Sequence, residues 1–420
     1  MSEAIKDIPG IPDPYSIPLE SINMAQPILF KTEAHWKYFE RLRKEDPVHY
    51  CAESDVGPFW SVTKFNDIFE VDNNHEVFSS EEGITLGPPI SMKPEEQMKT
   101  PMFIAMDPPK HDVQRSTVAP VVAPRNLAAL EGTIRDRVIK ILDSLPRGET
   151  FDWVDTVSVE LTTQMLATLF DFPFEDRRKL TRWSDVATAA PGAGVIDSVE
   201  QRRDELMECL AYFTRLWNER VNQDEPGNDL ISMLANGENT KHMQPMEFLG
   251  NLILLIVGGN DTTRNSISGG VLALNQNPAQ YQKLREDLSL IPSMVSEIIR
   301  WQTPLAHMRR TALVDTVLGG KHIKAGDKVI MWYISGNRDE EVIERANEFI
   351  IDRPQARHHL SFGFGIHRCM GNRLAEMQLR IVWEEIMQRF HKVEVVGEPE
   401  RTLSSFVKGY THLPVRLHEI

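Results

Sequence analysis

The chain has 420 residues, with a hydrophobic content of 41% and a charged content of 25%, a composition that indicates a folded globular protein and excludes a disordered one. Its formal net charge of −15 argues against a nucleic-acid-binding surface and against attraction to anionic membranes, because both present phosphate groups. The N-terminus lacks the pattern of a signal peptide, and no apolar stretch has the ~20 residues needed to span a bilayer, so we expect a soluble cytoplasmic protein.

The proline-rich segment 1–25 predicts an irregular arm on the surface. Helical periodicity dominates after it, as in the apolar positions of 134–142 and 161–169. Strand patterns are few and short, and the clearest lie near residues 60, 320 and 330. These elements predict one domain over residues 1–420 that is mainly α-helical, with a small β part.

His111 and Arg115 follow the signals of a helix start in the segment MDPPKHDVQR. Asp107 is the expected N-cap and Pro108 the expected first-turn residue, which places His111 and Arg115 one turn apart on the same helix face. Two cationic donors in this arrangement suit a carboxylate ligand. Taken alone, such a pair is more often a solvated surface pair.

The longest helical signal runs from Pro245, a residue typical of the first helical turn, to Asn277. At about 1.5 Å per residue this helix would span roughly 50 Å. Its run LILLIVGG is strongly apolar, so we expect the helix to lie at the centre of the domain.

The middle of this helix reads GGNDTTRN. Gly258 and Gly259 weaken the helix, and the Thr262 hydroxyl can bond to a carbonyl one turn earlier, which predicts a kink or an opened turn. Asp261 and Thr262 place an acid and an alcohol on or beside an apolar face. That combination is costly in a core.

Two further segments carry charged residues with a suggestive spacing. Glu297 and Arg300 stand at i, i+3 in SEIIR, which predicts a structural ion pair rather than a catalytic one. The segment MRRTA that follows supplies Arg310, and His367 stands two residues before a cysteine.

That cysteine, Cys369, is the thiol whose surroundings indicate a function. Cys51, Cys209 and Cys369 lack paired spacing, so we expect neither a disulfide framework nor a Cys-rich zinc site, and the first two are most simply core residues. Apolar residues at helical spacing follow Cys369, which places it at or just before a helix N-terminus, where the dipole and free amide groups stabilise a thiolate. The glycines around it, Gly363, Gly365 and Gly371, permit tight turns and the close approach of a flat group.

Taken together, these motifs resemble those of the cytochrome P450 monooxygenases. Glu297 and Arg300 resemble the family's Glu-x-x-Arg helix, GGNDTT resembles its oxygen-activating helix, and DPPKHDVQR extends the match over nearly the whole chain. The resemblance implies the cytochrome P450 fold, with haem between the long central helix and the helix after the cysteine. The residues that resemble the family's haem-binding loop are Phe362, Gly363, Gly365, His367, Cys369 and Gly371.

The resemblance also implies a role for each residue. Cys369 would be the axial thiolate ligand of haem b, and Phe362, Gly363 and Gly371 would shape the cofactor site. Asp261 and Thr262 would deliver protons for the cleavage of dioxygen. Either Arg353 or Arg357 would complete the ion pair of Glu297 with Arg300. The residues implied to hold the haem propionates are His111, Arg115, Arg310 and His367.

The implied reaction, R–H + O₂ + 2e⁻ + 2H⁺ → R–OH + H₂O, needs an electron donor. No segment resembles a flavin, nicotinamide or Cys-rich iron–sulfur module, so electrons must come from separate proteins. The resemblance to bacterial members implies a [2Fe–2S] ferredoxin with its NAD(P)H-dependent ferredoxin reductase. Arg368 and Arg373 beside the cysteine are candidates for this contact, although exposed arginines are common.

The regions that line the substrate cavity in the family are apolar here, which predicts a small hydrophobic substrate without an obligatory ionic anchor. The motif-bearing segments resemble the bacterial alkane hydroxylase branch, which implies terminal hydroxylation of medium-chain alkanes or fatty acids and of some alicyclic compounds. A steroid or terpene hydroxylase is the alternative. The candidate wall residues, each of which taken singly is more often plain core, are Ile84, Leu86, Phe103, Leu254, Val257, Gly258, Leu305, Met308 and Phe406.

Proteins of other classes fit the sequence less well. A haem-thiolate sensor or binding protein would share Cys369 but would not need the pair of Asp261 and Thr262, and a peroxygenase usually lacks that pair. A cysteine hydrolase needs a well-placed histidine base, and His367 is only two residues from the cysteine in a loop, which is poor geometry. The sequence therefore favours a monooxygenase.

Overall fold

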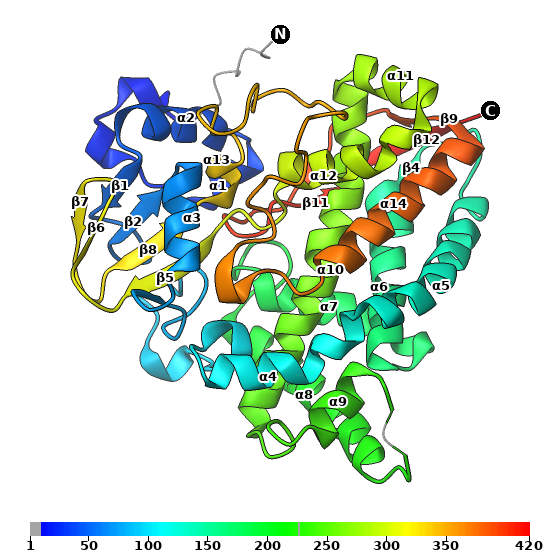
Figure 1. Cartoon of the computed structure of the whole chain (residues 1–420), viewed down its shortest axis with the longest axis horizontal. Helices are drawn as coiled ribbons and strands as arrows, with labels where there is room; N and C mark the ends of the chain where they lie inside the picture. Colours follow the sequence, from blue (N-terminus) through cyan, green and yellow to red (C-terminus); the bar gives the residue numbers. More distant parts are fainter. Residues whose placement is uncertain (1–9, 226) are drawn as a thin grey trace.

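The computed structural model describes residues 10–225 and 227–420, and α-helices form most of its regular structure (Figure 1). The helical periodicity of 134–142 and 161–169 is confirmed by α5 and α6. The helices are α1 (Pro27–Lys31), α2 (His35–Glu45), α3 (Phe65–Asn73), α4 (Lys110–Val118), α5 (Pro124–Asp143), α6 (Glu160–Phe170), α7 (Arg178–Thr188), α8 (Val199–Val221), α9 (Leu230–Asn236), α10 (Pro245–Gln276), α11 (Pro278–Glu286), α12 (Ile291–Gln302), α13 (Tyr333–Gly336) and α14 (Asn372–Arg389).

The β part is small, as the sequence predicts, and its largest sheet has the strand order β1-β2-β8-β5-β3. Strands from the N-terminal region and from 308–331 lie side by side in it, next to α1, α2 and α3 (Figure 1). The patterns near residues 60, 320 and 330 are confirmed by β2, by β6 with β7, and by β8. The strands are β1 (Val48–Cys51), β2 (Phe59–Val62), β3 (Phe78–Ser79), β4 (Phe151–Asp152), β5 (Met308–Ala312), β6 (Thr316–Leu318), β7 (Lys321–Ile323), β8 (Lys328–Met331), β9 (Phe390–Val395), β10 (Glu400–Arg401), β11 (Tyr410–His412) and β12 (Pro414–Glu419).

The N-terminal arm differs from its prediction. Residues 10–25 are irregular apart from two short 3₁₀ turns, but Ile22 and Met24 are fully buried in an apolar cluster with side chains of α1 and α2. Burial of the Ile22 and Met24 side chains removes apolar surface from water and stabilises the fold. An arm lying on the surface would leave these side chains exposed. Residues 1–9 of the predicted arm lie outside the described residues.

Helix α10 runs through the middle of the molecule, as its apolar sequence predicts (Figure 1). It contacts α6, α7, α8, α12 and α14, so most of its length is covered by other helices. The helix is continuous from Pro245 to Gln276, and the opened turn predicted at Gly258 and Gly259 is not seen. The Thr262 hydroxyl does donate to the Gly258 carbonyl at 2.9 Å, as expected.

The segment before α4 also differs from its prediction. The helix begins at Lys110 after a cis peptide bond between Pro108 and Pro109, so Pro108 is not in its first turn. Asp107 does not cap it, because its carboxylate accepts hydrogen bonds from the Ser79 hydroxyl and the Ser80 backbone N–H. His111 and Arg115 nevertheless lie one turn apart on α4, as expected.

No helix within residues 10–225 and 227–420 combines the length and the apolar character that a membrane crossing requires.

Candidate active site

The loop 358–371 places Cys369 three residues before the first residue of α14, which confirms the predicted position before a helix N-terminus. The Cys369 backbone N–H donates to the Phe362 carbonyl at 2.8 Å, and the Gly363 N–H donates to Leu360 at 2.8 Å. Gly371 occupies the N-cap position of α14. Two tight turns therefore fold the loop back on itself and present the cysteine at the end of the helix.

Cys369 differs from the other two cysteines in its surroundings. Cys51 and Cys209 are buried, and burial raises the pKa of the Cys51 thiol to about 11. The Cys369 side chain is accessible, yet dehydration by the surrounding protein raises its pKa, while the Gly371 backbone N–H and the charges of Arg115 and Arg368 act in the opposite direction.

The central helix also has an accessible side. Gly258 is exposed in the middle of α10, and a Cβ atom added there would meet no other atom within 4 Å. Leu254, Val257 and Thr262 on the same helix are partly accessible. A Cβ atom on Gly371 would likewise meet open space. Helix α14, which follows Cys369, contacts α10, so these accessible positions belong to two neighbouring elements.

Four cationic or potentially cationic side chains gather beside Cys369. The rings of His111 and His367 lie 4.4 Å apart, and Arg115 donates to the carbonyl of Arg368, the residue before the cysteine. Burial, followed by the charge of Arg310 and then those of His111 and Arg115, lowers the pKa of His367 to about 2. The structure thus brings together residues that are more than 250 positions apart in the sequence.

Two ring nitrogens in this group are buried without a hydrogen-bond partner among the described residues, namely His111 Nε2 and His367 Nδ1. The opposite nitrogens are occupied, because His111 Nδ1 lies 2.7 Å from Asp112 Oδ1 and His367 Nε2 lies 3.0 Å from the Ser80 hydroxyl. Unpaired polar atoms are costly in a protein interior. Carboxylates of a haem would fit them, so the residues present suit the group that the sequence implies.

Arg310, the fourth member of the group, already has a carboxylate partner. Its Nη2 donates to Asp72 at 2.8 Å, and its Nη1 donates to the Arg309 carbonyl at 2.8 Å. A guanidinium has five N–H donors, so donors remain for a further acceptor. Asp72 carries no motif signal, because it lies in an ordinary amphipathic helix, and sequence reasoning missed it.

Asp261 and Thr262 lie on different sides of α10. Asp261 is fully buried and accepts a hydrogen bond from Ser184 of α7 at 2.9 Å. On α10 itself, it accepts from Asn260 at 3.1 Å and pairs with Arg264 at 2.9 Å. Burial raises its pKa, and the positive charge of Arg264 lowers it. Thr262, one residue later, is on the accessible side. The acid therefore does not face the accessible side of α10, which the sequence did not predict.

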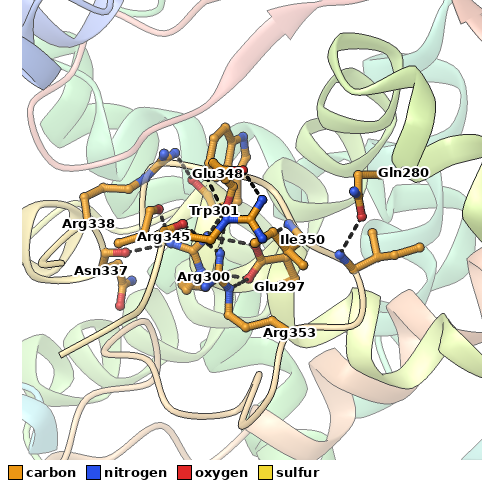
Figure 2. A network of polar contacts seen from close by, with 12 residues as sticks. Gln280, Glu297, Arg300, Trp301, Asn337, Arg338, Arg345, Glu348, Ile350 and Arg353 are labelled. Carbon is orange, nitrogen blue, oxygen red and sulfur yellow. Dashed lines mark hydrogen bonds and ion pairs between the residues drawn. The ribbon is translucent and has the colours of Figure 1, made fainter. Parts of the chain in front are cut away.

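Glu297 and Arg300 form the predicted ion pair, and both are fully buried (Figure 2). Arg300 Nε and Nη2 donate to the two carboxylate oxygens at 2.8 Å, and Arg353 Nε donates to Glu297 at 3.0 Å. Arg353 is therefore the third partner. Arg357 is not, because it pairs with Glu376 at 2.9 Å near the surface.

This ion-pair network holds the long loop between α13 and Cys369. The remaining guanidinium N–H groups of Arg300 and Arg353 donate to backbone carbonyls, and the Ile350 N–H donates to Glu297 at 2.8 Å. Helix α14 also contacts α12, so the helix after the cysteine and the loop before it are held against the same helix. The carbonyls that accept from the two arginines belong to Asn337, Glu344, Arg345, Ala346 and Glu348.

The predicted wall residues are not all on the accessible side. Leu86 and Phe103 are almost fully buried in two different apolar clusters, and the structure places them as core residues. Ile84, Leu305, Met308 and Phe406 are partly accessible, as are Leu254 and Val257 on α10. Leu305 pairs with Val407 in an isolated β-bridge, and the Phe406 carbonyl accepts from the Ala306 N–H at 2.8 Å, so these two segments lie together.

Comparisons with known proteins agree with this geometry. Residues 195–410 match the model of the cytochrome P450 family. Cytochrome P450-153 from Novosphingobium aromaticivorans has a solved structure that is 49% identical, with a TM-score of 0.88, and the match covers 94% of this chain and 99% of that one.

Two curated bacterial relatives are similar over most of their length. A linalool 8-monooxygenase of Pseudomonas putida is 35% identical over 413 residues, which are 95% of this chain and 99% of the relative. A methyl-branched lipid omega-hydroxylase of Mycobacterium bovis is 32% identical over 390 residues, which are 90% of both chains. These matches show that the chain belongs to the cytochrome P450 family, and the thiol before a helix N-terminus, with unpaired histidine nitrogens beside it, agrees with them. The chain is a haem b-dependent monooxygenase of this family.

Proposed function

We propose that this monooxygenase hydroxylates hydrophobic aliphatic substrates at the terminal carbon, with medium-chain alkanes or fatty acids as the main class and alicyclic compounds also accepted. The accessible side of α10 carries the proposal, because Leu254, Val257 and Gly258 offer it apolar surface and no charge. The resemblance of the motifs to the alkane hydroxylase branch supports the proposal, as does the 32% sequence identity with a methyl-branched lipid omega-hydroxylase.

In this proposal the Cys369 thiolate would bind the haem iron, and Phe362, Gly363 and Gly371 would shape the loop and leave room for the flat cofactor. Haem b supplies the activation of O₂ for the reaction R–H + O₂ + 2e⁻ + 2H⁺ → R–OH + H₂O. The propionates would be held by His111 Nε2, His367 Nδ1 and the free N–H groups of Arg115 and Arg310.

Asp261 and Thr262 move protons across α10. Asp261 lies among Ser184, Asn260 and Arg264 on the side of α7, while the Thr262 hydroxyl lies on the accessible side and donates back to Gly258. A carboxyl whose pKa is raised by burial holds a proton more readily than an exposed one. The acid thus serves as the proton source and the threonine as the group that presents the proton to the reaction.

Thr262→Ala should still bind haem and substrate but should lose the hydroxyl that delivers the proton. We expect the alcohol formed per reductant consumed to fall by about tenfold or more, with the missing electrons appearing as peroxide. Product and peroxide are quantified together with NAD(P)H consumption. The control is Thr263→Ala, since Thr263 is the neighbouring threonine and is buried. An unchanged ratio of alcohol to reductant in Thr262→Ala would refute the relay.

Electrons come from a [2Fe–2S] ferredoxin with its NAD(P)H-dependent ferredoxin reductase. Arg368 and Arg373 are exposed beside the cysteine loop, where opposite charge on an acidic ferredoxin would favour docking.

Terminal attack requires a shaped channel, because a secondary C–H bond is weaker than a primary one and would otherwise react first. Leu305 and Phe406 are suited to narrow it, since they come from two segments that are joined by backbone hydrogen bonds. Met308 begins β5 two residues before Arg310 and is also partly accessible.

The experiment that tests the function is a panel of medium-chain alkanes, fatty acids and alicyclic compounds turned over with a reconstituted ferredoxin system. We expect terminal alcohols from the wild type. Leu305→Ala, Met308→Ala or Phe406→Ala should shift the products toward subterminal alcohols, because a tenfold change in product ratio needs only about 1.4 kcal/mol. Gas chromatography measures the ratio. Leu313→Ala, which truncates an exposed leucine, is the control and should change nothing. Terminal alcohol ratios that stay the same in all three variants would contradict the proposed channel.

A steroid or terpene hydroxylase is the second candidate, and the 35% identity with a linalool 8-monooxygenase favours it. The same panel, extended by a terpene alcohol and a steroid, decides between the two. Faster product formation from either compound than from every alkane and fatty acid would establish the second candidate.

A further inference from the structure

Asp72 is a buried carboxylate that joins four parts of the molecule. It lies near the C-terminus of α3 and is 2% exposed. Its Oδ1 accepts from Arg310 Nη2 at 2.8 Å, and its Oδ2 accepts from the Tyr333 hydroxyl and the Phe364 backbone N–H, each at 2.7 Å. A single side chain thus connects α3, β5, α13 and the loop that carries Cys369.

The cysteine loop is pressed against the same residue. Gly363 and Gly365 both have a φ of +63°, which favours glycine. A Cβ atom on Gly363 would lie 3.1 Å from Asp72 Oδ2 and 3.3 Å from the Tyr333 hydroxyl, and one on Gly365 would lie 2.5 Å from the Asp72 carbonyl oxygen. The loop therefore rests on the end of α3, and Asp72 lies at the contact.

We propose that Asp72 is a positioning residue of the haem site, which fixes the cysteine loop through Phe364 and aims Arg310 at a haem propionate. The inference rests on the proposed function, in which Cys369 and Arg310 contact haem. The three hydrogen-bond partners of Asp72 are all donors, and a carboxylate can accept from all of them. An amide at this position would turn its NH₂ group toward at least one of these donors. Two of the three hydrogen bonds determine where residues that touch haem are placed.

Asp72 also offsets the positive charge of Arg310, the nearest cation in its surroundings. Two opposite charges buried side by side present little net field, whereas an uncompensated guanidinium favours added negative charge nearby. Reduction of ferric to ferrous haem adds one negative charge. Loss of the Asp72 carboxylate should therefore raise the reduction potential, an effect that a purely structural role of Asp72 would not produce.

The test uses Asp72→Asn holoprotein. We expect the ferric/ferrous equilibrium constant to shift toward ferrous by about tenfold, which is ~59 mV for one electron. We also expect a smaller share of the thiolate-type ferrous CO spectrum, and haem transfer to excess apoglobin at least about tenfold faster, since a fixed partner of the loop is lost. The measurements are redox titration, CO difference spectra and stopped-flow haem transfer.

The matched control is Asp339→Asn. Asp339 lies in the loop after α13, is also buried, and accepts from the Phe65 N–H at 2.9 Å at the other end of α3, so the same chemical change is made to a carboxylate that contacts the same helix. It should lower stability but leave the potential and the CO spectrum unchanged. A wild-type potential and haem transfer rate in Asp72→Asn, or equal shifts in Asp339→Asn, would overturn the proposal.

A second variant covers the case in which Asp72→Asn does not fold. Tyr333→Phe removes one of the three hydrogen bonds and keeps the charge, so haem transfer should be faster while the potential stays the same. An unchanged transfer rate in Tyr333→Phe would then overturn the inference. The haem assignment on which the inference rests fails separately, because its failure would appear as a wild type without a thiolate-type CO spectrum.

Discussion

Cys369→Ala should abolish the ferrous CO absorption at about 450 nm that thiolate-ligated haem gives, because no other thiol lies at the site. The expected loss is complete rather than partial, since the remaining cysteines, Cys51 and Cys209, are both buried elsewhere in the core. The measurement is the CO difference spectrum of the reduced protein, together with its haem content.

The control for this prediction is Cys51→Ala. It removes a thiol of β1 that is enclosed in another apolar cluster, so the CO spectrum should keep the position and the yield of the wild type. A thiolate-type spectrum that persists in Cys369→Ala would show that another residue binds the iron, and the assignment of the whole loop would then fail.

Glu297→Gln should have the second largest effect, this time on folding. The Glu297 carboxylate is fully buried and accepts hydrogen bonds from Arg300, Arg353 and the Ile350 backbone N–H. A glutamine would leave the two guanidinium groups without a counter-charge, and its NH₂ group would point at N–H groups from which it cannot accept a hydrogen bond. Removing one partner of a buried ion pair typically costs about 3–5 kcal/mol. Denaturant unfolding and the yield of haem-loaded protein measure the effect.

Glu376→Gln is the matched control, because Glu376 also pairs with an arginine but near the surface. Arg357 is 79% exposed and lies 2.9 Å from Glu376, and a pair of this kind contributes roughly 0–1 kcal/mol. The two variants make the same chemical change, but Glu297 is fully buried, whereas Glu376 is 17% exposed and its partner lies at the surface. Equal losses of stability would mean that burial of the Glu297 network is not what stabilises the loop before the cysteine.

The sequence by itself determined the features that depend on local chemistry. The apolar run and Pro245 predicted the central helix α10, and the helical spacing after Cys369 predicted α14, because a helix follows from the residues within a few turns. The pair of Glu297 and Arg300 was also predictable, since residues three apart on a helix lie together. The family motifs then connected these local features to haem.

Only the tertiary structure decided which distant groups meet. Arg353 and Arg357 are four positions apart and carry the same side chain, and packing alone brings the first to Glu297 and leaves the second at the surface. Asp72 and Arg310 are 238 positions apart, and no periodicity in either segment announces their ion pair. Burial makes such pairs obligatory, because a lone charge in the interior is too costly, but the choice of partner depends on how the helices and the sheet pack.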